Sequence, residues 1–233
     1  IMDYLKFKSG SDIRGYALGD EANPLYMSDV MVMCSAAAFA RWLRNKTNKE
    51  DIFVSVGHDS RLSAERIKHA VIKALTTNGV SVADCGLSST PAMFMTTVEM
   101  NCDGAVQITA SHHPKDRNGL KSFTRDGGLD GSDIAEILKI ASGLTEPVGN
   151  KNTKCTKHDF MARYSEILRN MIIEGVDDKN DREHPLKNMK IVVDAGNGVG
   201  GFYAKEVLEP LGADTSGSLY LNPDGNFPNH APN

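Results

Sequence analysis

Hydrophobic and polar positions alternate regularly along the first 150 residues. Apolar residues recur at helical spacing in four segments: 28–44, 63–77, 90–101 and 132–142. Short apolar runs that predict strands lie at 52–56, 80–85 and 104–108, and a further short strand at 121–124 is expected to pair antiparallel. Strands alternating with helices indicate a sheet covered on both faces. The pattern predicts an α/β fold, a three-layer α/β/α domain with a mixed sheet.

The polar loop 145–156 separates this block from a predicted helix at 158–174. We place a domain boundary at about residue 150, which gives a first domain at 1–150 and an incomplete second domain at 151–233. The second domain is expected to begin a similar α/β unit with a strand, a glycine turn and a helix, in that order: 190–194, 195–198 and 199–211.

Composition restricts the function classes. The formal charge of -4 argues against nucleic-acid binding, which usually needs a basic surface. No apolar run approaches the roughly 20 residues that span a bilayer, and residues 1–8 lack a signal-peptide pattern, so we expect no membrane partner and a cytoplasmic location. The four cysteines lack C-x-x-C spacing, and we expect buried free thiols at Cys34, Cys85, Cys102 and Cys155.

A polar, cationic segment follows the predicted strand at 104–108. It reads Thr109-Ala110-Ser111-His112-His113-Pro114, and Asn118-Gly119-Leu120-Lys121 comes shortly after it. A serine on a turn at the end of a strand is exposed, and nearby imidazoles and an ammonium can manage charge during group transfer. We predict Ser111 as the reacting residue. The alternative is a turn hydroxyl that only satisfies a backbone amide.

Two more polar loops, 11–15 and 58–61, lie where ligands collect on open α/β sheets. Glycines on both sides of Arg14 favour close approach of backbone to a phosphate, for which the guanidinium offers a planar fork. We expect these loops to converge with the Ser111 turn and residues 118–121 into one cationic pocket. Alternatively, Arg14 pairs with Asp12, and His58 and Arg61 are polar residues at a helix start.

Two other segments carry residue types found in metal and dinucleotide sites. His112 and His113 have no visible third ligand at metal-binding spacing. Residues 196–201 match G-x-G-x-x-G after a predicted strand, but only Asp214 is available as the acidic residue of a dinucleotide site. We therefore favour a tight strand-to-helix turn over a dinucleotide site.

Taken together, these segments resemble the α-D-phosphohexomutases, the phosphomannomutase/phosphoglucomutase family. The family's phosphoserine loop, T-A-S-H-N-P followed by N-G-x-K, matches 109–114 and 118–121. Residues 9–15 resemble its N-terminal arginine loop, 57–61 its G-x-D-x-R segment, and 193–198 its second-domain glycine turn. The resemblance runs along the whole chain.

The resemblance implies an isomerase that is an intramolecular phosphotransferase. Ser111 would pass a phosphoryl group between O1 and O6 of a phosphohexose, through a hexose 1,6-bisphosphate that is both intermediate and activator. The implied catalytic residues are Arg14, Ser111, His112 and Lys121. The implied substrate-binding residues are Ser11, Arg14, His58, Arg61, His113 and Asn118. One Mg²⁺ ion is implied, held in part through the phosphate on Ser111.

The sequence also departs from the family pattern. His113 replaces an asparagine, and Lys115-Asp116-Arg117 fills a stretch that is commonly aromatic. The family's D-x-D-x-D magnesium loop has no counterpart, and neither do its third and fourth domains. We therefore expect little or no mutase activity without the C-terminal domains of the parent chain. The rival hypotheses are a non-catalytic homologue that binds a sugar phosphate or a partner, and an NAD-dependent oxidoreductase.

Overall fold

The computed structural model describes residues 2–232, and its first part is built on one eight-stranded mixed sheet. The strands are β1 (Lys8–Ser9), β2 (Asp12–Tyr16), β3 (Phe53–His58), β4 (Ser81–Leu87), β5 (Gly104–Ile108), β6 (Arg117–Thr124), β7 (Gly127–Gly128) and β8 (Cys155–Lys157). Their order is β1-β2-β6-β5-β3-β4-β8, with β7 paired to β6. The strands β5, β3, β4 and β8 run parallel, whereas β1, β2, β6 and β7 pair antiparallel.

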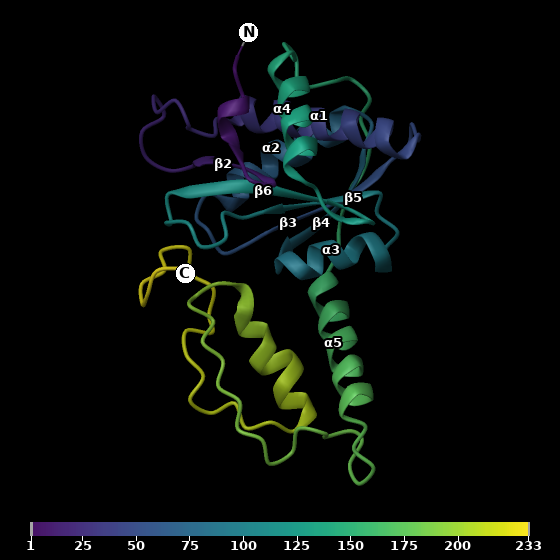
Figure 1. Cartoon of the computed structure of the whole chain (residues 1–233), viewed down its shortest axis with the longest axis vertical. Helices are drawn as coiled ribbons and strands as arrows, with labels where there is room; N and C mark the ends of the chain where they lie inside the picture. The colour runs from purple at the N-terminus through teal and green to yellow at the C-terminus, as the bar shows by residue number, and fades with distance from the viewer. Residues whose placement is uncertain (1, 233) are drawn as a thin grey trace.

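Helices cover both faces of this sheet (Figure 1). One face packs against α1 (Asp29–Thr47), α2 (Ala64–Thr77) and α4 (Gly131–Ser142), next to the short helix η1 (Leu5–Phe7). The other face packs against α3 (Thr90–Glu99), which in turn contacts α5 (Phe160–Val176). The predicted three-layer α/β/α architecture is confirmed.

Local sequence explains where the helices begin. Ser28 and Ser89 each accept a backbone N–H of the first turn that follows, at the starts of α1 and α3. Asp130 and Asp133 form a reciprocal capping box at the start of α4. These caps satisfy donors that have no partner within the helix, so the ends agree with the prediction to within a few residues.

The strand β6 is longer than expected and begins at Arg117 instead of residue 121. It pairs antiparallel with β5 on one side and β2 on the other, so Ile108 lies opposite Leu120 and Arg14 opposite Gly119. Because two neighbours supply hydrogen bonds, the strand extends into residues whose polarity suggested a loop. This extension places the predicted Asn118–Lys121 segment inside the sheet.

The second unit is less regular than predicted. Residues 190 and 194 form single parallel bridges to Asp214 and Leu219 in place of the expected strand. A sheet needs three or more strands for independent stability, and two extended segments do not reach that. The expected helix is a succession of η2 (Val199–Gly201), the π-helix η3 (Tyr203–Leu208) and η4 (Glu209–Leu211). Pro210 in η4 lacks the N–H that a continuing α-helix requires.

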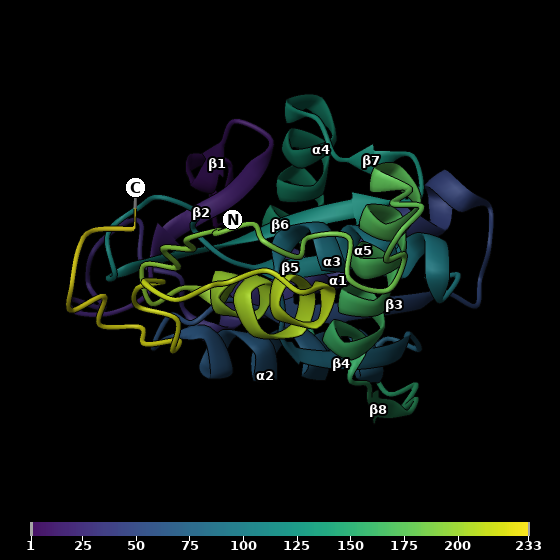
Figure 2. The ribbon, with the colours of Figure 1, turned by 90° about the horizontal axis from the view of Figure 1, so that it is seen from below.

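The second unit lies across the face of the sheet that carries α3, as the view from below shows (Figure 2). Before the second unit, the chain returns to the first sheet, because β8 pairs parallel with β4 after residue 150.

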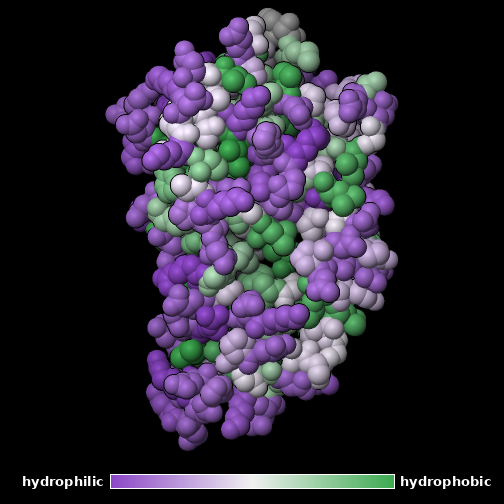
Figure 3. Space-filling model, turned by 180° about the vertical axis from the view of Figure 1, so that it is seen from behind, coloured by the Kyte–Doolittle hydropathy of each residue, from purple (hydrophilic) through white to green (hydrophobic). Residues whose placement is uncertain are grey.

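The rear face of the molecule is mostly hydrophilic. Hydrophobic side chains are visible near the middle of this face, whereas hydrophilic residues cover most of the rest (Figure 3). Within residues 2–232, no helix has the length and apolar composition needed to cross a bilayer. Cys155 is exposed, contrary to expectation, and the other three cysteines are buried.

Candidate active site

The Ser111 loop joins β5 to β6. Its serine is exposed and has a φ of 56°, a left-handed conformation that is uncommon outside glycine. The Oγ atom lies 3.4 Å from Nδ1 of His112. The hydroxyl is therefore presented to solvent beside an imidazole, as the sequence predicted.

Hydrogen bonds through the side chains of Thr109 and Asp59 hold the backbone at Ser111 in place. The Ser111 N–H donates to Oγ1 of Thr109 at 3.0 Å, and Thr109 Oγ1 donates to Oδ2 of Asp59 at 2.7 Å. Asp59 lies just beyond the end of β3, next to the end of β5. Hydrogen bonds therefore tie the loop to the carboxyl ends of two neighbouring parallel strands.

Arg61 has a different place from the one expected, because it faces the loop backbone. Its Nε donates to Asp59 at 3.2 Å. Its two terminal nitrogens donate to four carbonyl oxygens at 2.6–3.0 Å, those of Ser111, His113, Pro114 and Arg117. A guanidinium has five donors, and all of them are used. Its side chain is 0% exposed, so it has no donor left for a substrate. Burial lowers the pKa of Arg61, and the Asp59 carboxylate partly offsets this.

A second cationic group lies on the sheet. Asp12 accepts from Arg14 at 2.7 Å with one carboxylate oxygen and from Lys121 at 2.8 Å with the other. The carboxylate is 7% exposed, whereas the side chains of Arg14 and Lys121 are 13% and 28% exposed. The arrangement confirms the alternative in which Arg14 pairs with Asp12. It also leaves both cations with unused donors.

The sheet register connects this group to the Ser111 loop. Arg14 lies opposite Gly119, whose carbonyl accepts from the N–H of Thr109 at 3.1 Å. A Cβ at Gly119 would lie 2.9 Å from the Arg14 side chain, so only glycine leaves room for it there. Arg14 is therefore connected to the Ser111 loop through Gly119 and Thr109, and Thr109 lies two positions before Ser111.

The charges around the loop change the pKa of His113, the histidine next to His112. Partial burial, and then the positive charges of Arg14 and Arg117, lower the pKa of His113 below its ordinary value of 6.5. Its ring centroid is 5.0 Å from that of His112. His113 is therefore uncharged at neutral pH and can accept a proton or a hydrogen bond.

Three other predicted substrate-binding residues have structural contacts. His58 is buried, with Nδ1 2.7 Å from the Asp59 carbonyl and Nε2 3.1 Å from Glu65. Asn118 is fully buried and bonds Ser63 and the Gly119 N–H. Both side chains are buried and bond residues at the start of α2, Glu65 for His58 and Ser63 for Asn118. Ser11 lies half-buried in the turn between β1 and β2, one residue before Asp12.

A pocket of about 300 Å³ lies between the Ser111 loop and the second unit. The first part contributes Asp59, Ser60 and Ser111, and the second unit contributes its glycine turn and His230. His230 Nε2 lies 3.2 Å from Asp194, and the Ala231 carbonyl and this carboxylate raise the pKa of His230. The predicted glycine turn therefore faces the predicted serine.

The residues present do not provide a magnesium site. Among residues 2–232 there is no cluster of three His, Cys, Asp or Glu side chains placed to hold a metal. The connector aspartates are engaged elsewhere: Asp177 pairs with Lys179 and Arg182, and Asp181 with His184. The donor set that Mg²⁺ prefers is not assembled here.

Sequence reasoning missed Asp12 and Thr109 as members of the site and gave Asp59 no role. Each lies within a quoted motif, so their positions carried a signal. Their function depends on contacts between segments about 50 to 109 residues apart, which the motif alone does not indicate.

Comparisons with known proteins agree with this geometry. Residues 6–147 match the family described as phosphoglucomutase/phosphomannomutase, alpha/beta/alpha domain I, and residues 163–233 match its alpha/beta/alpha domain II. The chain is 33% identical to a phosphoglucomutase of Neisseria gonorrhoeae, over 77% of this chain and 36% of that protein. It is 32% identical to a phosphoglucomutase/phosphomannomutase of Thermococcus kodakarensis, over 82% of this chain and 41% of that protein.

A solved structure shows the same fold. A phosphoglucomutase/phosphomannomutase family protein from Burkholderia thailandensis superposes with a TM-score of 0.76 and 27% identity, over 97% of this chain and 46% of that chain. The chain thus spans less than half the length of each of these relatives. Two domain matches and a shared fold give one conclusion: the chain belongs to the phosphoglucomutase/phosphomannomutase family.

Proposed function

We propose that this chain carries the phosphoserine part of a phosphohexomutase, an isomerase that moves a phosphoryl group between O1 and O6 of a phosphohexose. The observation that carries the proposal is the exposed Ser111 hydroxyl, 3.4 Å from His112 Nδ1. Family membership supports the substrate class, since the relatives are named for phosphoglucose and phosphomannose mutase activity.

In the proposed step, a sugar hydroxyl oxygen forms a bond to phosphorus while the bond between phosphorus and Ser111 Oγ breaks. The sugar hydroxyl gives up its proton to a base, and Oγ takes one up from an acid. His112 is within reach of Oγ and fits the second role. The return transfer from the other end of the hexose 1,6-bisphosphate reverses these movements, so Ser111 is phosphorylated again.

Arg14 and Lys121 are proposed to stabilise the negative charge of the phosphoryl group. A phosphoserine carries about -1.5 to -2 charges at neutral pH, and phosphoryl transfer depends on positioning and charge stabilisation. Both cations retain donors beyond their bonds to Asp12, unlike Arg61. Mg²⁺, which the family implies, would stabilise charge on the phosphate, but the residues described here do not form its site.

The test is phosphate uptake at position 111. The purified chain, incubated with glucose 1,6-bisphosphate, is expected to gain one phosphate by intact-mass spectrometry. Ser111→Ala is expected to lose the adduct, and Ser132→Ala, a serine at the start of α4, is expected to keep it. An adduct that persists in Ser111→Ala contradicts the proposal. If the wild-type chain binds the bisphosphate without gaining phosphate, it is a non-catalytic sugar-phosphate binder.

We further propose that this chain has little mutase turnover alone, because residues 2–232 contain no assembled magnesium donor set and the chain spans less than half the length of its relatives. A coupled assay that gives normal turnover would contradict this. The domain boundary near residue 150 and a cytoplasmic location stay predictions.

A further inference from the structure

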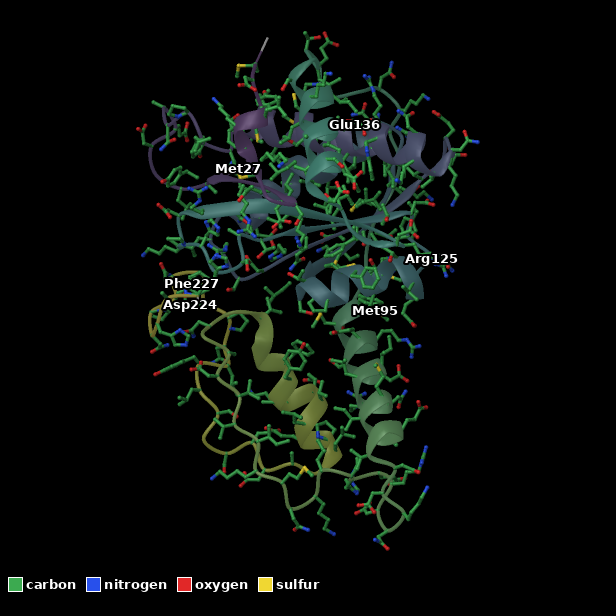
Figure 4. The ribbon with its side chains drawn as sticks, viewed as in Figure 1. Met27, Met95, Arg125, Glu136, Asp224 and Phe227 are labelled. Carbon is green, nitrogen blue, oxygen red and sulfur yellow. The ribbon has the colours of Figure 1, made fainter. Side chains whose placement is uncertain are left out.

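The turn at residues 224–227 presses on the segment that carries Arg61. The Arg61 guanidinium carbon lies 5.4 Å from the centre of the Phe227 ring, within the range of a cation–π contact. Gly225 is buried, and a Cβ there would lie 2.6 Å from the Leu62 nitrogen and 2.9 Å from the Arg61 carbonyl carbon. Asp224 and Phe227 lie on the C-terminal loop just beneath the sheet (Figure 4). The turn therefore joins the second unit to the residue that holds the Ser111 loop.

Hydrogen bonds within the second unit also hold the 224–227 turn. The N–H of Phe227 donates to the Asp224 carbonyl at 3.0 Å, and the N–H of Asn226 donates to the Asp224 carboxylate at 2.9 Å. The N–H of Asp224 donates to the carbonyl of Asn197 at 2.8 Å, and Asn197 lies in the glycine turn. The contact on Arg61 is therefore made by an anchored element.

Backbone strain marks both ends of this connection. Ser111 has a φ of 56° and Phe227 a φ of 48°. A left-handed conformation is an outlier for a bulky aromatic residue, and it persists only where the surroundings hold it. Around Phe227 these surroundings include Arg61, and around Ser111 they include the hydrogen bond from the same arginine to the Ser111 carbonyl.

We propose that Arg61 is a positioning residue for Ser111 and that the 224–227 turn is a latch that holds Arg61 in place. Docking of the second unit through this turn then sets how well the Ser111 loop is ordered for phosphoryl transfer. The significance for catalysis rests on the proposed function, but the mechanical link between turn and loop does not.

Amide hydrogen exchange by NMR tests the mechanical link. The reporters are loop amides with defined acceptors: Ser111, His113 and Arg117. Phe227→Leu removes the aromatic face and is expected to speed their exchange about threefold to tenfold, the size of a lost cation–π contact. Gly225→Ala, which forces the turn away from residues 60–62, is expected to have a similar or larger effect.

The matched controls lie in α5 and beside it. Gly175→Ala places a Cβ where no atom lies within 4 Å, and Phe202→Leu alters a ring that packs in a tilted arrangement against Tyr203 and Tyr164. Both are expected to leave exchange of the three loop amides unchanged. If Phe227→Leu folds with an unchanged thermal midpoint and the loop amides also exchange at the wild-type rate, the latch does not exist.

The rate of Ser111 phosphorylation by glucose 1,6-bisphosphate tests the catalytic consequence. Phe227→Leu is expected to lower the maximal rate about threefold to tenfold, the size of a lost cation–π contact, while the half-saturating concentration stays the same, because positioning is lost and binding is not. Arg61→Lys is expected to lower the maximal rate by more than Phe227→Leu does, because a lysine cannot keep the five bonds of the guanidinium. A rise in the half-saturating concentration with an unchanged maximal rate would instead make Arg61 a binding residue. If the wild-type chain takes no phosphate, the proposed function fails, while the exchange experiment still decides the latch.

Discussion

Two cationic regions are connected to the Ser111 loop, and they differ in how their donors are used. All five N–H donors of the Arg61 side chain bond to protein acceptors, and the side chain is fully buried. Arg14 and Lys121 share one carboxylate, that of Asp12, and remain partly exposed. Positive charge therefore serves two purposes: Arg61 builds the loop, and Arg14 and Lys121 keep donors for the phosphoryl group that we propose they bind. Variants in the two regions should separate these roles.

The largest effect is expected from Arg61→Met. The change removes the guanidinium bonds to four carbonyl oxygens and the positive charge that pairs with Asp59, so the free energy of unfolding should fall by about 3–5 kcal/mol. Arg14→Met should cost about 1 kcal/mol, since Lys121 still pairs with Asp12. Urea denaturation measures both. Equal losses would remove the distinction between the two regions.

Next in size is the double variant Arg14→Met with Lys121→Met. Each single change leaves Asp12 one counter-charge, but the double change leaves a carboxylate that is 7% exposed without any. The double variant should lose about 3 kcal/mol, more than the sum of the single losses. A double-mutant cycle in urea measures this coupling, and simple additivity would show that the two cations do not share Asp12.

A smaller effect separates Asn118 from Ser11, which the sequence placed together as substrate-binding residues. Asn118→Ala removes bonds to Ser63 and to the Gly119 N–H inside the core, at a cost of about 2 kcal/mol. Ser11→Ala in the turn should change the unfolding free energy by less than about 0.5 kcal/mol. Thermal and urea unfolding of both variants check this, and a large loss in Ser11→Ala would be contrary to it.

The smallest expected effect concerns the pKa of His113. His113 should titrate below 6.5 by NMR, because burial and the nearby arginines disfavour its charged form. Since its pKa is lower in the folded state, this residue reduces stability as the pH falls through its ordinary value, and has no such effect well above it. Arg117→Gln should raise this pKa, as should phosphorylation of Ser111, which adds negative charge. A pKa at or above 6.5 in the unphosphorylated chain would contradict the positive field around the loop.

Much of the first domain could be predicted from the sequence. Its helices and strands are set by hydrophobic period and by caps such as Asp130, which are local properties. The exposed position of Ser111 could be predicted because a strand leads directly into its loop. What the sequence could not show was the division of labour between Arg14 and Arg61, because that depends on which acceptors are within reach in the fold. The carbonyl oxygens that accept hydrogen bonds from Arg61 belong to residues 50 to 56 positions away along the chain.

The second unit was predicted less well for a different reason. The apolar run at 190–194 has the composition of a strand, but a strand also needs neighbours, and only single bridges form there. Periodicity likewise predicted one helix at 199–211, whereas the backbone changes its hydrogen-bond pattern twice before Gly212. Pattern alone predicts a tendency, and the partners of a segment decide whether it is realised.

The return of the chain to pair β8 with β4 has a practical consequence. Residues 155–157 cover the outer side of β4, with Val82 opposite Cys155 and Asp84 opposite Lys157. A protein ended at residue 150 would have β4 as an open edge, whose unpaired peptide groups invite strand addition by another molecule and hence aggregation. A protein ended after residue 157 would keep that edge shielded.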